Sequence, residues 1–375
     1  MHGWAQTAAG DVINNTDNGF NWKAAADQYG AIILAPNATG NVYGNHCWDY
    51  ASTRHNRSTG HDAILLDLVN RFVSNTQYAI DPRQVYVAGL SSGGGEAMAL
   101  ACMAPDIFAG AGINAGPPPS TTTSQISYVP GGFNATTAGN NCRALAGANA
   151  SNFATQIASV IWGTSDYTVA QAYGPMDAAA MRIAYGGNFY QGATTTVATG
   201  GSNISYTDVN GKLRTSEITM SGMGHAWPTG TGGQNTNFVN ATTVNYPAFL
   251  MNFWSANNLR VNQGGTPVGP PVVAACAASV SGSTVTVSGS GTASGGAISS
   301  YKVVLNGPTA VNDAAAGSGT GLTSAACTLA SFTVGTAPAP TYTATTSSNY
   351  ALVQAGRAHN GNGYRWRMGR TRTWG

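Results

Sequence analysis

Charged side chains are scarce in this chain: they make up 8% of its 375 residues, and the formal net charge at pH 7 is +2. A chain of this kind has no broad positive field to attract phosphates, so we expect no nucleic-acid partner. It also lacks any run of about 18 uninterrupted apolar residues, which excludes a membrane-spanning helix and predicts no membrane partner. Neutral polar side chains must therefore keep the protein in solution.

Cysteine patterns typical of metal sites are absent too. The five cysteines include no Cys-x-x-Cys pair, and no histidine lies at a spacing suited to zinc, so we expect disulfides, no metal and no cofactor. Cys102 with Cys142, and Cys276 with Cys327, each fall within one proposed domain. Cys47 is then the candidate for the unpaired thiol.

From about residue 20 to residue 259, short apolar runs alternate with longer amphipathic runs, which indicates parallel strands joined by helices. Residue 211 is the Gly of an Asn-Gly pair that suits a tight hairpin turn. The expected elements are strands over 31–35, 84–88 and 159–162, a hairpin of 204–209 with 213–220, and helices over 62–74 and 244–256.

The composition changes after residue 260, where a Gly- and Pro-rich stretch without periodicity indicates a linker. Beyond it, β-branched and polar residues alternate between short turns, which is typical of a small antiparallel sandwich. We therefore predict an α/β domain over 1–260, a linker over 261–271, a fibronectin- or Ig-like β module over 272–345, and a separate segment over 346–375.

The candidate nucleophile is Ser91, in the one G-x-S-x-G pattern of the chain, Gly89-Leu90-Ser91-Ser92-Gly93. A β-rich run leads into it and a helical run leads out. This context is typical of the strained strand-to-helix turn that holds a serine clear of the sheet in α/β-hydrolases. We accordingly predict an α/β-hydrolase fold, with a mostly parallel sheet flanked by helices.

A serine hydroxyl needs a base within hydrogen-bond reach and a carboxylate that orients the base. In this fold class the chain order is Ser, then Asp or Glu, then His. Between Ser91 and residue 264 the chain has one histidine, His225, on a Gly-flanked loop after an apolar strand. His225 is therefore the predicted base.

Asp166 is the predicted acid, because it follows a strand and its carboxylate would emerge at the same sheet edge as the nucleophile. Three other aspartates compete. Asp106 lies close behind the nucleophile helix, Asp177 lies in a helical stretch, and Asp208 lies beside a hairpin turn, where aspartate often bonds locally.

The backbone N–H groups of Ser92 and Trp4 are the predicted oxyanion hole, one after the nucleophile and one on an early loop. Trp48 and Trp227 flank the proposed site blocks and are candidate contacts to an apolar substrate. The alternative for both indoles is packing in the core.

Five blocks of the sequence, in order, resemble the extracellular poly(3-hydroxybutyrate) depolymerases with the type 1 catalytic domain. They are His2-Gly3-Trp4-Ala5-Gln6, Cys47-Trp48-Asp49-Tyr50, Gly89-Leu90-Ser91-Ser92-Gly93, Trp162-Gly163-Thr164-Ser165-Asp166 and Gly222-Met223-Gly224-His225-Ala226-Trp227-Pro228. The resemblance covers most of residues 1 to 259. It departs from the family at Trp4, where a cysteine is usual, which leaves the partner of Cys47 in doubt.

The resemblance implies a serine esterase that is secreted, acts as a monomer, and cleaves an insoluble polyester and its oligomers. The rivals are a feruloyl or acetylxylan esterase and an oxidised poly(vinyl alcohol) hydrolase, since a triad alone does not specify a substrate. A polymer-binding protein with an inactive hydrolase domain is the alternative outside the enzymes.

The ends of the chain depart from what the family implies. Strands that normally precede the early loop are missing, and no basic start with an apolar core marks a secretory leader, so we expect an N-terminally truncated sequence. Residues 346–375 resemble the opening of a substrate-binding domain and then turn arginine-rich. We expect a frameshift there, the alternative being a basic tail for an anionic partner.

Overall fold

A computed structural model describes the chain as two compact units, Met1–Pro270 and Pro271–Gly375. Side chains are described for residues 1–14, 17–39, 44–51, 55–198 and 200–261; beyond these, the backbone of the strands given below is described. No helix in the described part of the chain is long and apolar enough to cross a bilayer.

Six strands form the central sheet of the first unit: β1 (Tyr86–Leu90), β2 (Gly110–Asn114), β3 (Ile157–Gly163), β4 (Phe189–Ala198), β5 (Gly201–Asp208) and β6 (Leu213–Met220). Their spatial order is β1-β2-β3-β6-β5-β4. The first four of these run parallel, while β5 and β4 continue the sheet in antiparallel pairing. Of the parallel strands, β2 and β3 in the middle of the sheet are buried and mostly apolar, as expected for a sheet covered on both faces.

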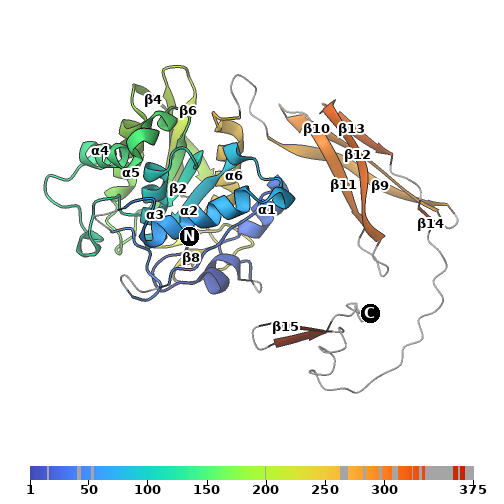
Figure 1. Cartoon of the computed structure of the whole chain (residues 1–375), viewed down its shortest axis with the longest axis horizontal. Coiled ribbons are helices and arrows are strands. Elements are labelled where there is room, and N and C mark those ends of the chain that lie inside the picture. The colour runs from blue at the N-terminus through green and yellow to red at the C-terminus, as the bar shows by residue number, and fades with distance from the viewer. Residues whose placement is uncertain are drawn as a thin grey trace. The chain divides into compact units, whose positions relative to one another are not determined.

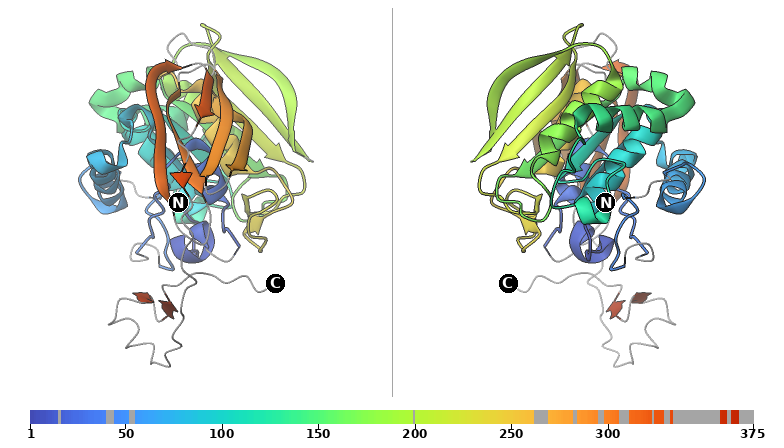
Figure 2. Two further views of the ribbon diagram at one scale, coloured as in Figure 1. Left: turned by 90° about the vertical axis from the view of Figure 1, so that its right-hand side faces the viewer. Right: turned by 90° about the vertical axis from the view of Figure 1, so that its left-hand side faces the viewer.

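The helices cover both faces of this sheet (Figures 1 and 2). They are α1 (Trp22–Tyr29), α2 (Gly60–Val73), α3 (Ser92–Met103), α4 (Ala135–Ala146), α5 (Tyr173–Tyr185) and α6 (Tyr246–Asn257). Residues of α2, α3, α4 and α5 share one hydrophobic cluster, and residues of α1 and α6 share another. This two-faced α/β architecture agrees with the predicted fold class.

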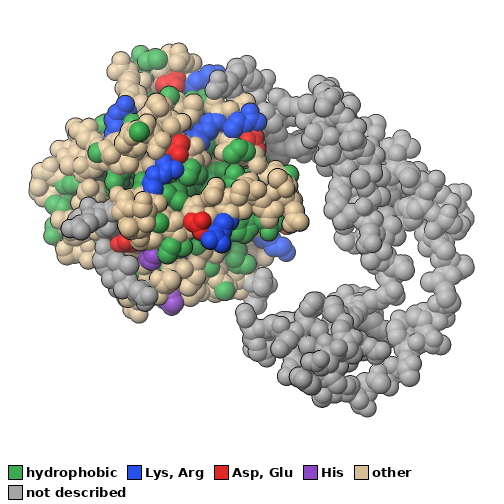
Figure 3. Space-filling view, viewed as in Figure 1, with side chains coloured by type: hydrophobic (Ala, Val, Ile, Leu, Met, Phe, Trp, Pro, Cys, Tyr) green, Lys and Arg blue, Asp and Glu red, His purple; other side chains and the backbone are tan. Residues whose placement is uncertain are grey.

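Shorter elements connect the larger ones. They are η1 (Ala8–Ile13), η2 (Thr76–Tyr78), η3 (Pro82–Gln84), η4 (Thr123–Gln125), η5 (Gly147–Ala154), β7 (Trp227–Pro228) and β8 (Val239–Asn240). Charged side chains are dispersed among uncharged ones on the face seen in Figure 3, as the composition predicts.

Most of the elements predicted for the first unit are confirmed: the helices over 62–74 and 244–256 are α2 and α6, the strand over 159–162 lies in β3, and the hairpin is β5 with β6. Gly211 has a φ of 71° in its turn, the conformation for which glycine was expected. The strand predicted over 84–88 begins two residues late, at Tyr86, because η3 occupies the preceding turn.

The strand predicted over 31–35 is wrong, since this segment has no regular secondary structure. Ala31, Ile33 and Ala35 do pack against the core at every second position. However, a cavity of about 390 Å³ is lined both by this segment and by Tyr86 and Ala88 of β1. The apolar alternation over 31–35 therefore reflects the partial burial of this segment. The segment lacks the ladder of hydrogen bonds that defines a strand.

A disulfide joins Cys102 of α3 to Cys142 of α4, as expected from their shared domain. Cys47 is buried and free, and burial raises the pKa of its thiol to about 11. Cys276 and Cys327 fall outside the residues whose side chains are described.

Strands of the second region are β9 (Gly269–Ser281), β10 (Thr284–Ser294), β11 (Ile298–Leu305), β12 (Val311–Leu322), β13 (Ser324–Thr328), β14 (Phe332–Thr333), β15 (Ala358–Gly361) and β16 (Tyr364–Arg367). The pairs β10 with β13, β11 with β12 and β15 with β16 are antiparallel. The side chains of the predicted fibronectin-like module and of the segment over 346–375 lie outside the described residues, and those two assignments stay predictions.

Candidate functional site

Ser91 occupies a sharp turn between β1 and α3. Its backbone has φ 58° and ψ −121°, a conformation that residues other than glycine rarely adopt. The Ser91 N–H donates to the carbonyl of Asn114 at 2.9 Å, and the Ser91 carbonyl accepts the N–H of Gly95 at 2.9 Å. The predicted strand-to-helix elbow is therefore present, with Ser91 at its apex.

The two glycines of the G-x-S-x-G pattern are required by close backbone approach. A Cβ on Gly89 would lie 2.1 Å from the carbonyl oxygen of Gly93. A Cβ on Gly93 would lie 2.3 Å from the carbonyl oxygen of His2. Any larger residue at either position would push the elbow apart, so the motif is a steric requirement of this turn.

Asp166 and His225 are brought together from loops that follow β3 and β6. His225 Nδ1 lies 2.8 Å from Asp166 Oδ2, and the other carboxylate oxygen accepts the N–H groups of Thr168 and Val169, each at 2.9 Å. Asp166 is buried. A carboxylate fixed in this way holds the imidazole in the tautomer with its proton on Nδ1, which makes Nε2 the nitrogen that can accept a proton.

Asn114, at the end of β2, connects the nucleophile turn with the histidine loop. Its backbone carbonyl holds Ser91, as described above, and its side-chain amide donates to the carbonyl of Ala226 at 3.0 Å. Asn114 is fully buried. Sequence reasoning missed this residue; its position at the carboxyl end of an apolar strand, beside the strand that carries Ser91, was the available signal.

The first residues of the chain line the elbow. The Leu90 N–H donates to the carbonyl of Met1 at 3.2 Å, and a Cβ on Gly3 would lie 3.4 Å from Cβ of Ser91. The Gly3 N–H is taken by the side chain of Gln6 at 2.7 Å. The Trp4 side chain is 54% exposed. The oxyanion role predicted for this residue concerns its backbone N–H.

Ser92 is the first residue of α3, where backbone N–H groups have no partner within the helix. Its amide is therefore of the kind that can bind an anion. The oxyanion hole formed by the amides of Ser92 and Trp4 remains a prediction.

Trp48 and Trp227 are both buried in the core, at 2% and 1% exposure. The Trp48 indole donates to the carbonyl of His2, and the Trp227 indole donates to the carbonyl of Phe20 and stacks on its ring. These arrangements favour the packing alternative for both side chains. We therefore do not assign either indole a contact with substrate.

The competing aspartates are engaged elsewhere. Asp106 forms a bidentate pair with Arg57, and Asp208 accepts the N–H groups of Asn210 and Lys212 in the β5–β6 turn. Asp177 is fully buried in α5, and burial raises the pKa of its carboxyl well above the ordinary value. Of the four candidates, Asp166 is the one whose carboxylate contacts His225.

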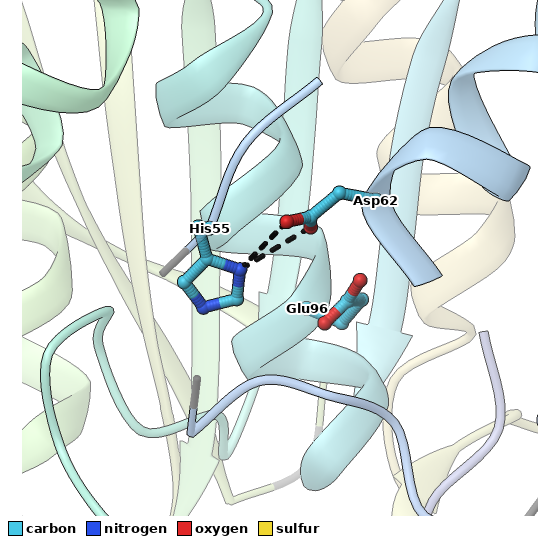
Figure 4. Close-up of side chains that lie close together, drawn as sticks. All are labelled: His55, Asp62 and Glu96. Carbon is cyan, nitrogen blue, oxygen red and sulfur yellow. Dashed lines mark hydrogen bonds and ion pairs between the residues drawn. The ribbon is translucent and has the colours of Figure 1, made fainter. Parts of the chain in front are cut away.

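In the described part of the chain, three side chains of types that can bind a metal ion lie close together: His55, Asp62 and Glu96 (Figure 4). None of the predicted triad residues belongs to this group. It was not foreseen from the sequence, where no metal was expected.

Comparison with known proteins gives one family. The family described as Esterase PHB depolymerase matches residues 1–186. Over its whole length the chain is 57% identical to a poly(3-hydroxybutyrate) depolymerase of Ralstonia pickettii, 80% of which it covers. It is 28% identical over 236 residues to poly(3-hydroxyalkanoate) depolymerase C of Paucimonas lemoignei, a match that spans 62% of this chain and 55% of that protein.

Among solved structures, the acetyl xylan esterase of Aspergillus awamori matches with a TM-score of 0.43 and 20% identity, over 60% of this chain and 81% of the esterase.

Proposed function

Since the chain belongs to the poly(3-hydroxybutyrate) depolymerase family, we propose that it hydrolyses the ester bonds of poly(3-hydroxybutyrate), with Ser91 as nucleophile, His225 as base and Asp166 as acid. The observation that carries the residue assignment is the contact of His225 Nδ1 with Asp166 Oδ2 at 2.8 Å. It supports an oriented base on the loop that Asn114 links to the turn of Ser91, the candidate nucleophile.

In the proposed reaction, Ser91 Oγ attacks the ester carbonyl while its proton passes to Nε2 of His225. The amides of Ser92 and Trp4 donate to the oxyanion, and a donor of this kind is worth about 10²- to 10³-fold in kcat. Protonated His225 then gives its proton to the departing alkoxide, which leaves as a hydroxyl-ended chain. Water, deprotonated by His225, attacks the acyl-Ser91 ester and releases the acid.

We also propose that the enzyme acts outside the cell, as a monomer, on the insoluble polymer and its oligomers. The disulfide between Cys102 and Cys142 supports an oxidising compartment, because such bonds persist mainly in exported proteins. The 57% identity to the poly(3-hydroxybutyrate) depolymerase of Ralstonia pickettii supports the polyester substrate class.

Two assays test the activity together: clearing of a turbid poly(3-hydroxybutyrate) suspension and hydrolysis of a soluble short-chain p-nitrophenyl ester. We expect the wild-type chain to do both and Ser91→Ala to lose both. Ser151→Ala, which alters an exposed serine of η5, is the matched control and should retain both activities.

The outcomes separate the parts of the proposal. Ester hydrolysis without clearing would retain Ser91 and contradict the polyester substrate. Full activity of Ser91→Ala in either assay would refute the assigned nucleophile.

A further inference from the structure

A second histidine–aspartate pair joins His55, in the segment before α2, to Asp62, in the first turn of that helix. His55 Nδ1 lies 3.1 Å from Asp62 Oδ2 and 3.2 Å from Asp62 Oδ1, and their side chains are only 2% and 4% exposed. Glu96, from the second turn of α3, faces the same point (Figure 4). One donor atom from each of the three side chains lies within 4.8 Å of the other two.

The surroundings of His55 fix the orientation of its ring. Nε2 lies 3.1 Å from the carbonyl oxygen of Tyr50, to which it donates its proton. Metal-binding histidines commonly use one ring nitrogen for such a backbone carbonyl and the other for the ion. Here the second nitrogen, Nδ1, is directed toward the carboxyl groups.

Glu96 is fully buried, and in the described structure neither of its carboxylate oxygens has a hydrogen-bond partner. A buried carboxyl without a partner is costly, since it loses its hydration and gains nothing in return. The side chain is therefore suited to a cation that would sit between it and Asp62.

We propose that His55 Nδ1, Asp62 and Glu96 form a structural binding site for a divalent transition-metal ion, for which Zn²⁺ is the probe. One nitrogen and two carboxylate oxygens are ligands typical of zinc, whereas Ca²⁺ prefers oxygen ligands alone. Donors bound at about 2.0–2.2 Å in a tetrahedral site lie about 3.3–3.6 Å apart, so the three side chains would have to approach by up to about 1.5 Å to form the site.

An ion bound at this site would link His55 and α2 to α3, the helix that begins next to Ser91. Glu96 lies five residues after Ser91, and a Cβ on its neighbour Gly95 would lie 2.9 Å from Cβ of Tyr50. His55, Asp62 and Glu96 come from three separate places in the sequence, so an ion bound by all three would lower the free energy of the folded state alone. The predicted role is stability, with no part in the ester chemistry.

The test is isothermal titration calorimetry of the full chain with ZnCl₂ after treatment with EDTA and dialysis, together with thermal unfolding in the presence and absence of Zn²⁺. We expect one Zn²⁺ per chain, a higher Tm with Zn²⁺, and a much weaker response to CaCl₂. Glu96→Gln replaces the unpartnered carboxyl by an amide of the same size, and it should weaken Zn²⁺ binding at least tenfold.

His55→Gln, which removes the nitrogen ligand, should show the same loss and provides a second measurement if Glu96→Gln is poorly folded. Asp177→Asn is the matched control, because Asp177 is another fully buried carboxyl without a hydrogen-bond partner, and it should bind Zn²⁺ like the wild type. The proposal would be overturned if the folded wild-type protein bound no Zn²⁺, or if the wild type and both ligand variants bound it with equal affinity. The carboxyl groups would then be neutralised by protons and not by an ion.

Discussion

Among the described residues of the first unit, two histidine–aspartate pairs share one contact and differ in much of what surrounds it. His225 with Asp166 and His55 with Asp62 both place ring Nδ1 against a carboxylate, at 2.8 Å and 3.1 Å. In the first pair the free carboxylate oxygen takes two backbone N–H groups. In the second, the other ring nitrogen contacts a carbonyl, and a third carboxyl, that of Glu96, lies alongside.

The comparison shows that a contact between two side chains does not by itself indicate a role. In the first pair the carboxylate bonds Nδ1 of His225, which leaves Nε2 as the nitrogen for proton transfer and suits the proposed role beside a nucleophile. The second pair has its ring fixed at both nitrogens and an excess of carboxyl groups, which suits a cation. Substitutions in the two pairs should therefore affect different quantities.

The largest difference is expected for Asp166→Asn. The amide would favour the wrong imidazole tautomer, so kcat for ester hydrolysis should fall about 10⁴-fold, a far larger effect than the change in the free energy of unfolding. Steady-state kinetics and urea unfolding measure the two quantities. Asp67→Asn, at an exposed ion pair with Arg71, is the control and should change neither; a kcat within tenfold of wild type for Asp166→Asn would contradict the assigned acid.

A smaller effect, on stability, is expected for Asp62→Asn. The change leaves His55 without its buried carboxylate and weakens the bond from the Asn56 N–H, so the free energy of unfolding should fall by about 3 kcal/mol. Urea unfolding in EDTA measures it. An unchanged midpoint of unfolding would mean that this pair contributes nothing to the fold.

Sequence reasoning located the nucleophile turn and the residues of the first pair, because their positions follow from local chemistry. Glycines on both sides of Ser91 and a loop histidine after an apolar strand are visible without any tertiary contact. The same reasoning failed at residues 31–35, where an apolar alternation was taken for a strand. Whether an extended segment joins a sheet depends on a partner edge that the segment itself does not encode.

The second pair escaped prediction because its members meet through tertiary structure. The relevant signal was Glu96, the one charged residue of an otherwise apolar helix, α3. A charge in such a position is buried wherever the helix packs, so it requires a partner from elsewhere. Which partner it meets could not be read from the helix.

The effect expected for Asp177, a buried carboxyl without a histidine partner, is a dependence of stability on pH. Its pKa is raised by burial, so its contribution to stability is present below the unfolded-state pKa of about 4 and is lost as the pH rises through the folded-state value. Asp177→Asn removes this loss, so its unfolding free energy relative to wild type should rise by about 1.4 kcal/mol per pH unit within that interval. Urea unfolding between pH 4 and pH 7 measures the slope, and parallel profiles for the two proteins would contradict it.

The backbone conformation of Ser91 lowers the stability of the fold at the position of the proposed nucleophile. With φ at 58° and ψ at −121°, the position costs a serine about 1–3 kcal/mol that a glycine would not lose. A procedure that selected residues for folding stability alone would therefore place glycine at position 91 and remove the hydroxyl. A serine at this position despite that cost is what the proposed nucleophilic role requires.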